Sequence, residues 1–200
     1  MITTNIIIIV IFYLIGSLPF ALILTKLSGF GDIRKIGSGN VGATNVLRTG
    51  NKFLAFIVLG LDIIKGFIPF LILEFYFDGI DLLIKLFICH FAVLGHIFPI
   101  WLKFKGGKGV ATYIGFLIGA NSLIGFLFLI TWMIVALITK YSSLSSVIAT
   151  LIVPLCFFFI NSNYYIVIFF IYLTLIIILK HQKNIKRLLN KTENKIKLSK

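Results

Sequence analysis

The sequence predicts an all-α, polytopic membrane protein with seven transmembrane helices. Hydrophobic residues make up 60% of the chain and charged residues only 12%, whereas soluble domains carry about 25% charged residues. The mean hydropathy is +1.10, and apolar runs long enough to cross a bilayer as helices recur along the chain. These unbroken Ile, Leu and Phe runs favour helices over the alternating pattern of a membrane β-barrel. We expect one integral membrane domain over residues 1–200.

Seven apolar runs are the candidate spans. The fourth is much shorter than the others, so it is either a short crossing or a broken, re-entrant element. The seven runs are Asn5–Thr25, Phe53–Phe75, Leu82–Trp101, Val110–Ala120, Leu123–Thr139, Leu144–Ile160 and Tyr164–Leu179.

The distribution of positive charge predicts the orientation. With the N-terminus outside and the C-terminus cytoplasmic, the inner segments Lys26–Lys52, Leu102–Lys108, Lys140–Ser143 and the tail from Lys180 hold 17 of the 19 Lys and Arg residues. Cytoplasmic loops of membrane proteins carry such an excess. Without a fourth crossing the basic tail would face outwards, so the charge supports a short fourth span. The net charge of +13 is thus explained by topology and does not indicate nucleic-acid binding.

Charges inside the spans are expected to be paired, because isolated charges are costly at that depth. Asp62 and Lys65 stand three residues apart on the second run and predict an ion pair, and Lys85 is expected to pair with Asp81. His96, near Pro99, is interpreted as helix-end structure, and neither it nor His90 is assigned a catalytic role.

Small residues in the apolar runs predict packing features. Cys89 and Cys156 lie inside apolar runs and are expected to be free and to pack as small hydrophobic residues. Gly115 and Gly119 form a GxxxG pattern that predicts close packing of the short fourth helix.

The segment Gly37–Gly50, GSGNVGATNVLRTG, is the most polar stretch between two spans. Its glycines allow a backbone to approach a ligand closely, and its Ser, Asn and Thr side chains can donate or accept hydrogen bonds. Arg48 adds a planar cation suited to phosphate. Although the segment matches GxGxxG, no strand precedes it, so we exclude a dinucleotide-binding fold. A flexible polar loop remains the alternative to a binding site.

The segment Lys103–Thr112, KFKGGKGVAT, combines lysines and glycines just before the fourth run. It is not a Walker A motif, because Val110 stands where a Ser or Thr would follow the Gly-Lys pair. Membrane anchoring explains Lys103 and Lys105, but not the glycines around Lys108. A helix N-terminus and a lysine together are suited to bind an anion.

Two further polar clusters lie on the predicted inner side. His181 stands near the end of the last run and is either a general base or phosphate ligand, or an interfacial histidine. In the segment Tyr141–Ser146, the serines are expected to cap a helix, and one of them is a candidate ligand contact. The tail after Lys180 spaces apolar residues helically among lysines and is predicted to lie on an anionic leaflet.

No nucleophilic Cys or Ser with an obvious base is apparent, and no acidic cluster predicts a metal site. This pattern favours direct transfer between two bound substrates, without a covalent intermediate. A transporter of a small organic phosphate is the alternative function, motivated by the charges in the spans and the short fourth run.

The three segments GSGNVGATNVLRTG, HIFPIWLKFKGGKGVAT and HQKNIKRLLNKTE together resemble the acyl-phosphate-dependent glycerol-3-phosphate acyltransferases of bacterial membranes, the PlsY family. The resemblance covers essentially the whole chain. It implies transfer of a fatty acyl group from acyl phosphate to the 1-hydroxyl of sn-glycerol 3-phosphate, with lysophosphatidic acid and phosphate as products. It implies no cofactor and no metal, a location in the bacterial inner membrane with the active site on the cytoplasmic face, and a soluble phosphate acyltransferase as functional partner.

The resemblance also assigns roles to residues of one expected two-phosphate site at the bilayer surface. The catalytic candidates are Ser38, Arg48, Lys108, His181 and Asn184. The candidates for binding substrate or phosphate are Asn40, Thr44, Asn45, Gly106, Gly107, Gly109, and Ser143 or Ser146. The base is either His181 or a substrate phosphate oxygen. One departure is that Lys191 precedes Thr192-Glu193 where the family usually has glycine, which leaves the turn in the tail open.

Overall fold

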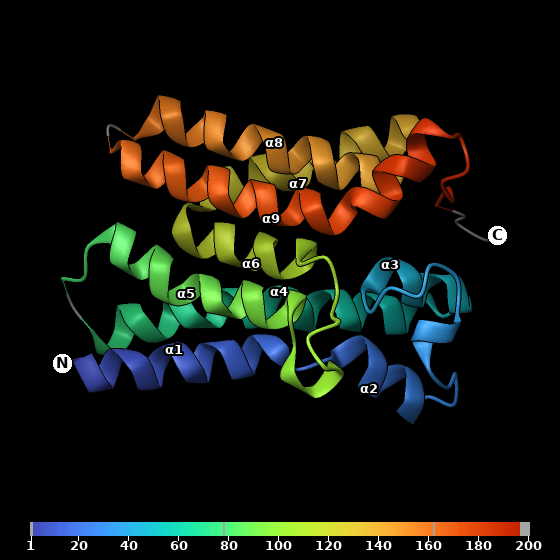
Figure 1. The fold of residues 1–200 in the computed structure, drawn as a ribbon, viewed down its shortest axis with the longest axis horizontal. Helices are drawn as coiled ribbons and strands as arrows, with labels where there is room; N and C mark the ends of the chain where they lie inside the picture. The colour runs from blue at the N-terminus through green and yellow to red at the C-terminus, as the bar shows by residue number, and fades with distance from the viewer. Residues whose placement is uncertain (1, 78, 162, 197–200) are drawn as a thin grey trace. The chain divides into compact units, whose positions relative to one another are not determined.

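The computed structural model describes residues 2–77, 79–161 and 163–196, and all regular secondary structure in these ranges is helical (Figure 1). Backbone contacts divide the chain into two compact units, Met1–Ala120 and Asn121–Lys200, which we call the first and second units. The prediction of one domain over residues 1–200 stays a prediction.

The first unit is built from six α-helices and three short 3₁₀ helices within the described residues. Its elements are α1 (Ile2–Ser17), α2 (Phe20–Leu27), η1 (Ile33–Lys35), α3 (Ala43–Val46), η2 (Leu47–Thr49), α4 (Lys52–Tyr76), α5 (Leu82–Ile97), η3 (Ile100–Leu102) and α6 (Val110–Ala120).

Glycines let the helices of the first unit cross closely. Helix α1 packs along α5, and α4 packs along α6. A Cβ on Gly66 of α4 would lie 2.0 Å from the carbonyl oxygen of Thr112, and one on Gly115 of α6 would lie 1.9 Å from that of Ile63. A Cβ on Gly119 would lie 2.4 Å from the ring of Phe70. The close packing predicted from Gly115 and Gly119 is therefore confirmed.

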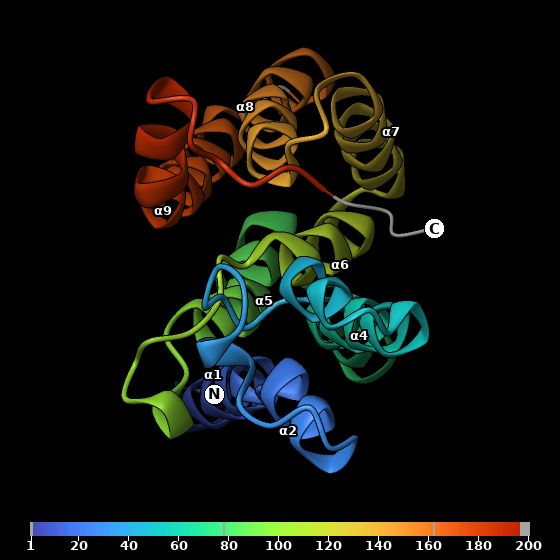
Figure 2. The ribbon, with the colours of Figure 1, turned by 90° about the vertical axis from the view of Figure 1, so that its right-hand side faces the viewer.

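The second unit contains α7 (Ser122–Thr139), α8 (Ser142–Ile160) and α9 (Tyr164–Leu189). Helix α8 packs against both of the others (Figure 2). Asn121 and Asn163 accept hydrogen bonds from the backbone at the start of α7 and α9, and such asparagine caps satisfy donors that a helix start leaves unpaired. Between α8 and α9, the rings of Phe157 and Phe170 stack with centroids 3.8 Å apart.

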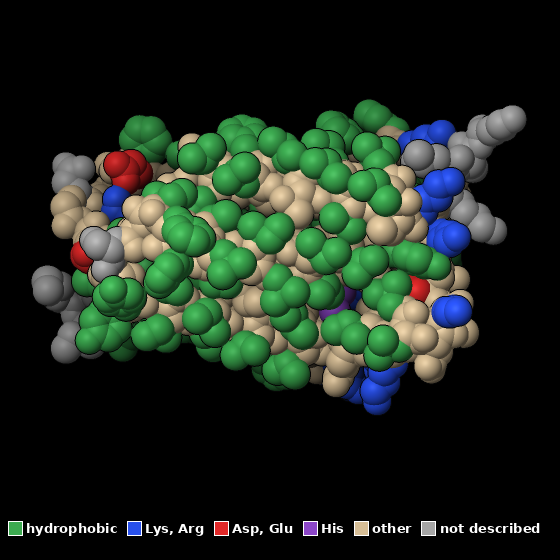
Figure 3. All heavy atoms as spheres, turned by 90° about the horizontal axis from the view of Figure 1, so that it is seen from above, with side chains coloured by type: hydrophobic (Ala, Val, Ile, Leu, Met, Phe, Trp, Pro, Cys, Tyr) green, Lys and Arg blue, Asp and Glu red, His purple; other side chains and the backbone are tan. Residues whose placement is uncertain are grey.

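Five helices of the described residues are long and apolar enough to cross a membrane, namely α4, α5 with η3, α7, α8 and α9. Helices α1 and α2 form a sixth candidate, and α6 has only 11 residues. All seven apolar runs are therefore helical, whereas seven crossings and the orientation of the termini stay predictions. On the face in Figure 3, hydrophobic side chains are widespread.

The first apolar run, Asn5–Thr25, contains two helices with a break between them. Helix α1 ends at Ser17 and α2 begins at Phe20, with a bend of 40° between them. Pro19 lies at the break and lacks the N–H group that a continuous helix would use. At the bend, the carbonyl oxygen of Leu18 accepts hydrogen bonds from Phe20 N at 3.1 Å and from Lys65 Nζ at 2.9 Å.

The two expected ion pairs differ in outcome. Lys65 Nζ lies 2.7 Å from Asp62 Oδ1, which confirms that pair. Lys85 instead pairs with Glu74 at 2.5 Å, so the prediction for Asp81 was wrong. The Asp81 carboxylate accepts the backbone N–H of Leu83 and caps α5. Cys89 and Cys156 are both free, as expected; Cys89 is buried and Cys156 is partly exposed.

Candidate active site

The segment Gly37–Gly50 forms an ordered loop that contains α3 and η2. Gly37, Gly39 and Gly50 have φ values of 56°, 70° and 87°, a region that glycine enters at little cost. At Gly37 a Cβ would lie 2.5 Å from Asn45 Oδ1 and 2.7 Å from Arg48 Cδ. The tight turn at Gly37 therefore depends on the absence of a side chain.

Asn45 is the centre of this loop, with a side chain that is 1% exposed. Its Nδ2 donates to the carbonyl oxygens of Ile33 and Ile36, at 3.0 and 2.9 Å. Its Oδ1 accepts from Ser38 N at 3.0 Å, from Ser38 Oγ at 3.2 Å and from Arg48 Nη1 at 3.3 Å. Both donors of the amide are thus used within the protein, so the side chain holds the loop. Asn45 therefore has a supporting role in the loop, and its role as a substrate ligand stays a prediction.

Asn45 brings Ser38 and Arg48, two of the predicted catalytic residues, to one side chain. Ser38 is exposed, and Arg48 is partly exposed. Asn40 and Thr44 are also partly exposed in the same loop. The loop thus presents the hydroxyl group of Ser38 and the guanidinium group of Arg48, and both groups are hydrogen-bonded to the buried amide of Asn45.

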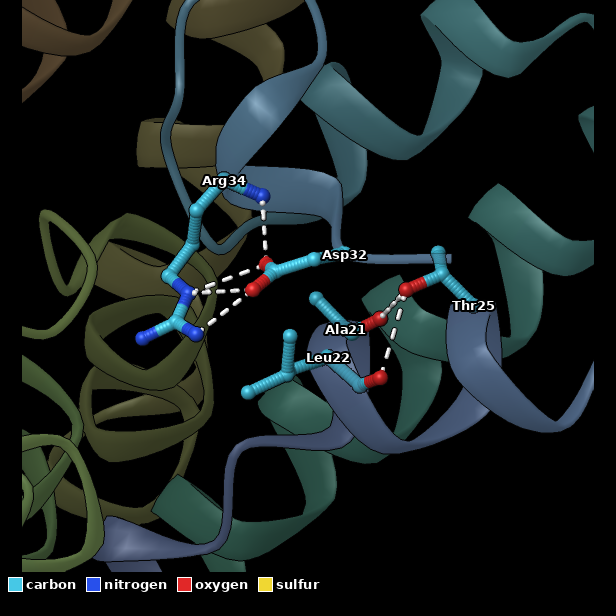
Figure 4. A network of polar contacts seen from close by, with 5 residues as sticks. All are labelled: Ala21, Leu22, Thr25, Asp32 and Arg34. Atoms are coloured by element: carbon cyan, nitrogen blue, oxygen red, sulfur yellow. Dashed lines mark hydrogen bonds and ion pairs between the residues drawn. The ribbon is translucent and has the colours of Figure 1, made fainter. Parts of the chain in front are cut away.

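The segment before the loop contains a second arginine with a different role. Arg34 donates from its backbone N, Nε and Nη2 to the carboxylate of Asp32 (Figure 4). The side-chain hydrogen bonds from Arg34, more than any other interaction, hold the pKa of Asp32 well below its ordinary value. Nearby, Thr25 Oγ1 donates to the carbonyl oxygen of Ala21 at 2.7 Å within α2. Arg34 is therefore engaged as the partner of Asp32.

The segment Lys105–Gly109, which we call the glycine–lysine loop, packs on the end of α5. A Cβ on Gly106 would lie 2.2 Å from the carbonyl oxygen of His96, and one on Gly107 would lie 2.1 Å from His96 Nε2. A Cβ on Gly109, which has a φ of 84°, would lie 2.8 Å from Ile97. Close packing against α5 therefore requires these three glycines.

The backbone donors of two of these glycines are used within the protein. Gly106 N donates to the carbonyl oxygen of Ile97 at 3.2 Å, and Gly107 N donates to that of His96 at 3.1 Å. The binding of phosphate by Gly106 and Gly107 stays a prediction. Lys108 is partly exposed and stands two residues before the start of α6, so it is the group of this loop that is suited to an anion.

Three buried ionisable side chains lie behind this loop. Asp62 and Lys65 are 1% and 2% exposed, and His96 is 8% exposed. His96 Nδ1 lies 3.6 Å from the same Asp62 oxygen that contacts Lys65. His96 does stand in the last turn of α5, as expected, but the sequence did not reveal its contact with Asp62.

In the second unit, His181 and Asn184 lie one turn apart on α9 and are 1% and 4% exposed. The Nδ1 atom of His181 lies 2.8 Å from the carbonyl oxygen of Ile177. A carbonyl oxygen only accepts hydrogen bonds, so this contact assigns the proton to Nδ1 and leaves Nε2 as the basic nitrogen of neutral His181. That tautomer is suited to a general base.

Glu193 organises the residues around the end of α9, and it is not among the predicted site residues. Its side chain is 5% exposed, and it accepts from Ser143 Oγ at 2.7 Å, from Asn184 Nδ2 at 2.6 Å and from Arg187 Nε at 2.6 Å. Burial raises the pKa of Glu193, but these hydrogen bonds outweigh burial and the net pKa is lowered. The signal in the sequence was an isolated acid in a strongly basic tail.

The serines at the start of α8 were expected to cap the helix, and they do not. The N-terminal cap position is Tyr141, and it makes no side-chain capping bond. Ser145 Oγ donates to the carbonyl oxygen of Tyr141, and Ser146 Oγ donates to that of Ser142 while accepting from Trp132 Nε1. Ser143 bonds to Glu193, which links it to Asn184. Of the two alternatives, Ser143 therefore lies with another predicted site residue, and Ser146 has a packing role between α7 and α8.

Comparison with known proteins identifies the family of this chain. A family model described as "Glycerol-3-phosphate acyltransferase" matches residues 6–191. The chain belongs to the glycerol-3-phosphate acyltransferase family. Enzymes of that name from Bartonella henselae and Pelagibacter ubique are 48% and 49% identical to it, over 194 and 186 residues. The alignments cover 96% and 93% of this chain and 92% and 94% of the relatives.

Solved structures agree with this assignment. The crystal structure of PlsY (YgiH), an integral membrane glycerol 3-phosphate acyltransferase, in its glycerol 3-phosphate form is 37% identical to this chain, with a TM-score of 0.90. The similarity covers 97% of this chain and 96% of that one. The lysophosphatidic acid form of PlsY has a TM-score of 0.87 at 36% identity. The resemblance to the PlsY family is confirmed, and the chain is a multi-pass integral membrane protein of that family.

Proposed function

We propose that this protein transfers a fatty acyl group from acyl phosphate to the 1-hydroxyl of sn-glycerol 3-phosphate. The observation that carries the proposal is the match of the glycerol-3-phosphate acyltransferase family over residues 6–191. The products are 1-acyl-sn-glycerol 3-phosphate, which is lysophosphatidic acid, and inorganic phosphate. The reaction takes place in the inner membrane of a bacterium, at its cytoplasmic face, and a soluble phosphate acyltransferase supplies the acyl phosphate.

In this reaction the hydroxyl oxygen attacks the acyl carbonyl carbon, and the bond from that carbon to the phosphate oxygen breaks. The hydroxyl proton passes to His181 Nε2 or to a phosphate oxygen of a substrate, and phosphate leaves with the bonding electrons. Acyl phosphate is already activated, so the reaction needs no covalent enzyme intermediate. The tautomer of His181 supports the first of the two bases.

Both substrates carry phosphate, and the loops of the first unit offer two cationic side chains. Arg48 and Lys108 each neutralise phosphate charge, and the guanidinium group of Arg48 can bind two oxygens at once. Ser38 donates to a substrate oxygen, and donors aimed at the acyl carbonyl stabilise the developing oxyanion. Asn40 and Thr44 contact substrate. Asn45, Gly106, Gly107 and Gly109 shape the loops and stay candidates for binding phosphate. Asn184 and Ser143 act with Glu193 in the second unit.

The test is an assay of purified protein in detergent or nanodiscs with acyl phosphate and glycerol 3-phosphate. We expect equal amounts of phosphate and lysophosphatidic acid, and no product when acyl-CoA replaces acyl phosphate. Absence of product with both donors would contradict the acyltransferase proposal. Uptake of glycerol 3-phosphate into sealed vesicles without any product would instead support the transporter alternative.

The assignment of phosphate-binding side chains is tested with matched variants. Arg48→Ala and Lys108→Ala should each lower kcat/KM by about 10- to 100-fold, because a hydrogen bond to a charged group contributes about 1.5–3 kcal/mol. Arg34→Ala and Lys103→Ala are the controls, since Arg34 is held by Asp32 and Lys103 is an exposed residue of the preceding turn. Equal losses in all four variants would mean that total charge, and not these two side chains, is important.

A further inference from the structure

The most unusual feature of the first unit that the proposed reaction does not use is the buried group of Asp62, Lys65 and His96. Buried charges are costly even when they are paired, and a pair of apolar residues would fill the same space at a lower desolvation cost. The three side chains help to line a cavity of about 10 Å³, which is room for about one water molecule. The group therefore does not hold a substrate, and its role must lie in what it contacts.

Its contacts reach three separate segments of the first unit. Lys65 Nζ contacts Asp62 on its own helix α4 and donates to the carbonyl oxygen of Leu18, at the break between α1 and α2. The Asp62 oxygen also faces His96 Nδ1 at the end of α5. One ion pair thus connects the α1–α2 break, the middle of α4 and the last turn of α5.

The imidazole of His96 continues this connection to the glycine–lysine loop. Its Nδ1 edge faces Asp62, and its opposite edge, at Nε2, lies against Gly107 so closely that a Cβ there would be 2.1 Å away. The backbone carbonyl oxygen of His96 accepts the N–H of Gly107. Both the ring and the backbone of His96 therefore fix the residue that precedes Lys108.

We propose that Asp62, Lys65 and His96 form a buried positioning group that fixes the glycine–lysine loop and so places Lys108 for a phosphate-bearing substrate. Asp62 orients the imidazole, Lys65 holds Asp62 and the α1–α2 break, and the imidazole supports Gly107. The part that concerns Lys108 rests on the proposed function. The part that concerns the loop does not, and it is tested without any activity.

The test of the loop is hydrogen–deuterium exchange of the full-length protein in nanodiscs. His96→Asn and Asp62→Asn should each speed exchange in peptides that cover residues 103–109, because the N–H groups of Gly106 and Gly107 are held by the end of α5. His90→Asn is the matched control, since His90 is a second buried histidine of α5, is 2% exposed and lies outside the group. Unchanged exchange in the loop of both test variants, or the same acceleration in the control, would overturn the proposal.

The test of Lys108 is a double-mutant cycle on kcat/KM. Displacement of a catalytic group by a distant substitution can cost about 100-fold, and we expect His96→Asn to cost about 10- to 100-fold in the wild-type background. In the Lys108→Ala background the same substitution should cost less than about 2-fold, because residues that act through one another are not additive. Equal losses in the two backgrounds would show that His96 acts through general stability and would overturn its role in placing Lys108.

The isosteric Asp62→Asn variant repeats the cycle without a change of side-chain volume, in case His96→Asn folds poorly. It is expected to show the same loss of coupling, and additivity would again count against the proposal. If wild-type protein has no acyltransferase activity, the proposed function fails while the exchange experiment still decides the role of the group in the loop.

Discussion

Asn45 shows how a single buried side chain organises the Gly37–Gly50 loop of the candidate site. The amide is 1% exposed and bonds to Ile33, Ile36, Ser38 and Arg48. From the sequence alone it was indistinguishable from Asn40, because composition does not tell which polar side chain of a loop turns inwards. Burial assigns Asn45 to the support of the loop and leaves Asn40 nearer to solvent.

We therefore expect Asn45→Ala to lower both stability and activity. The substitution removes the side-chain hydrogen bonds to the carbonyl oxygens of Ile33 and Ile36, each contributing about 1 kcal/mol, although each oxygen keeps a backbone donor. It also releases Ser38 and Arg48. Thermal unfolding in detergent should show a lower Tm, and kcat/KM should fall at a temperature where the protein is folded. Asn40→Ala is the control, and it should leave Tm nearly unchanged; a larger loss of Tm in the control would contradict the supporting role.

Glu193 leads to a prediction about pH at the same scale. Its pKa in the folded protein is lower than its ordinary value of 4.5, so the unfolded chain binds the proton more tightly than the folded protein does. The carboxylate therefore stabilises the fold above about pH 4.5, and this contribution is lost as the pH falls through the lower folded pKa. The Tm difference between wild type and Glu193→Gln should be largest near neutral pH and shrink in acid.

The control for this pH dependence is Glu74→Gln. Glu74 pairs with Lys85, but its side chain is 71% exposed, and exposed ion pairs contribute about 0–1 kcal/mol. Its substitution should change Tm less than Glu193→Gln at neutral pH. A Tm difference for Glu193→Gln that stays constant from neutral to strongly acidic pH would contradict the carboxylate's role.

At the scale of helices and turns, the sequence located the apolar elements well and their ends poorly. Each predicted run contains a helix, because long unbroken apolar stretches leave few alternatives. The break at Pro19, the cap at Asn121 and the continuation of α9 to Leu189 depend on local hydrogen bonds that hydropathy does not report. The extension of α9 is consistent with the helical spacing expected in the tail.

The turn after α9 explains the one departure from the family pattern. Lys191 has a φ of 57°, the left-handed region, which costs a side-chain-bearing residue about 1–2 kcal/mol. Glycine, which the resemblance to the family implies for this position, adopts this conformation freely. The turn that brings Glu193 back to α8 and α9 is therefore retained with lysine at its strained position.

Lys191→Gly should accordingly stabilise the protein by about 1 kcal/mol. The same substitution at Lys183, an exposed position inside α9, should destabilise it by about 1 kcal/mol, because glycine is a poor helix former. Thermal or denaturant unfolding of both variants in one detergent measures the contrast. A loss of stability at both positions would show that the Lys191 side chain itself is important.

Helix α4 provides a second contrast of this kind. Gly66→Ala places a Cβ 2.0 Å from the carbonyl oxygen of Thr112, whereas a Cβ on Gly60 would meet no atom within 4 Å. We expect Gly66→Ala to separate α4 from α6 and lower Tm by several degrees, since overpacking costs about 1–3 kcal/mol. Gly60→Ala should raise Tm slightly through helix propensity. Equal effects at the two positions would contradict the close crossing.

At the scale of the whole molecule, the number of crossings depends on whether α6 spans the membrane. Its 11 residues extend about 16 Å as an α-helix, about half the thickness of the hydrocarbon core. Length alone therefore argues against a crossing, whereas the distribution of Lys and Arg argues for one, because the segments around Lys140 and after Lys180 would otherwise lie outside. Charge usually decides orientation in short loops, so we predict that α6 crosses.

Single cysteines, introduced into a protein with Cys89 and Cys156 replaced by alanine, test whether α6 crosses the membrane. If α6 crosses, an impermeant thiol reagent added to intact cells labels Ser122→Cys and Asn161→Cys, and it labels Lys140→Cys and Lys186→Cys only after the membrane is opened. If α6 does not cross, all four results are reversed together. Tyr76→Cys and Lys103→Cys are the controls, because they precede α6 and should be outside and inside in either case. Reversal of the four positions with unchanged controls would reduce the number of spans to six and place the basic tail outside.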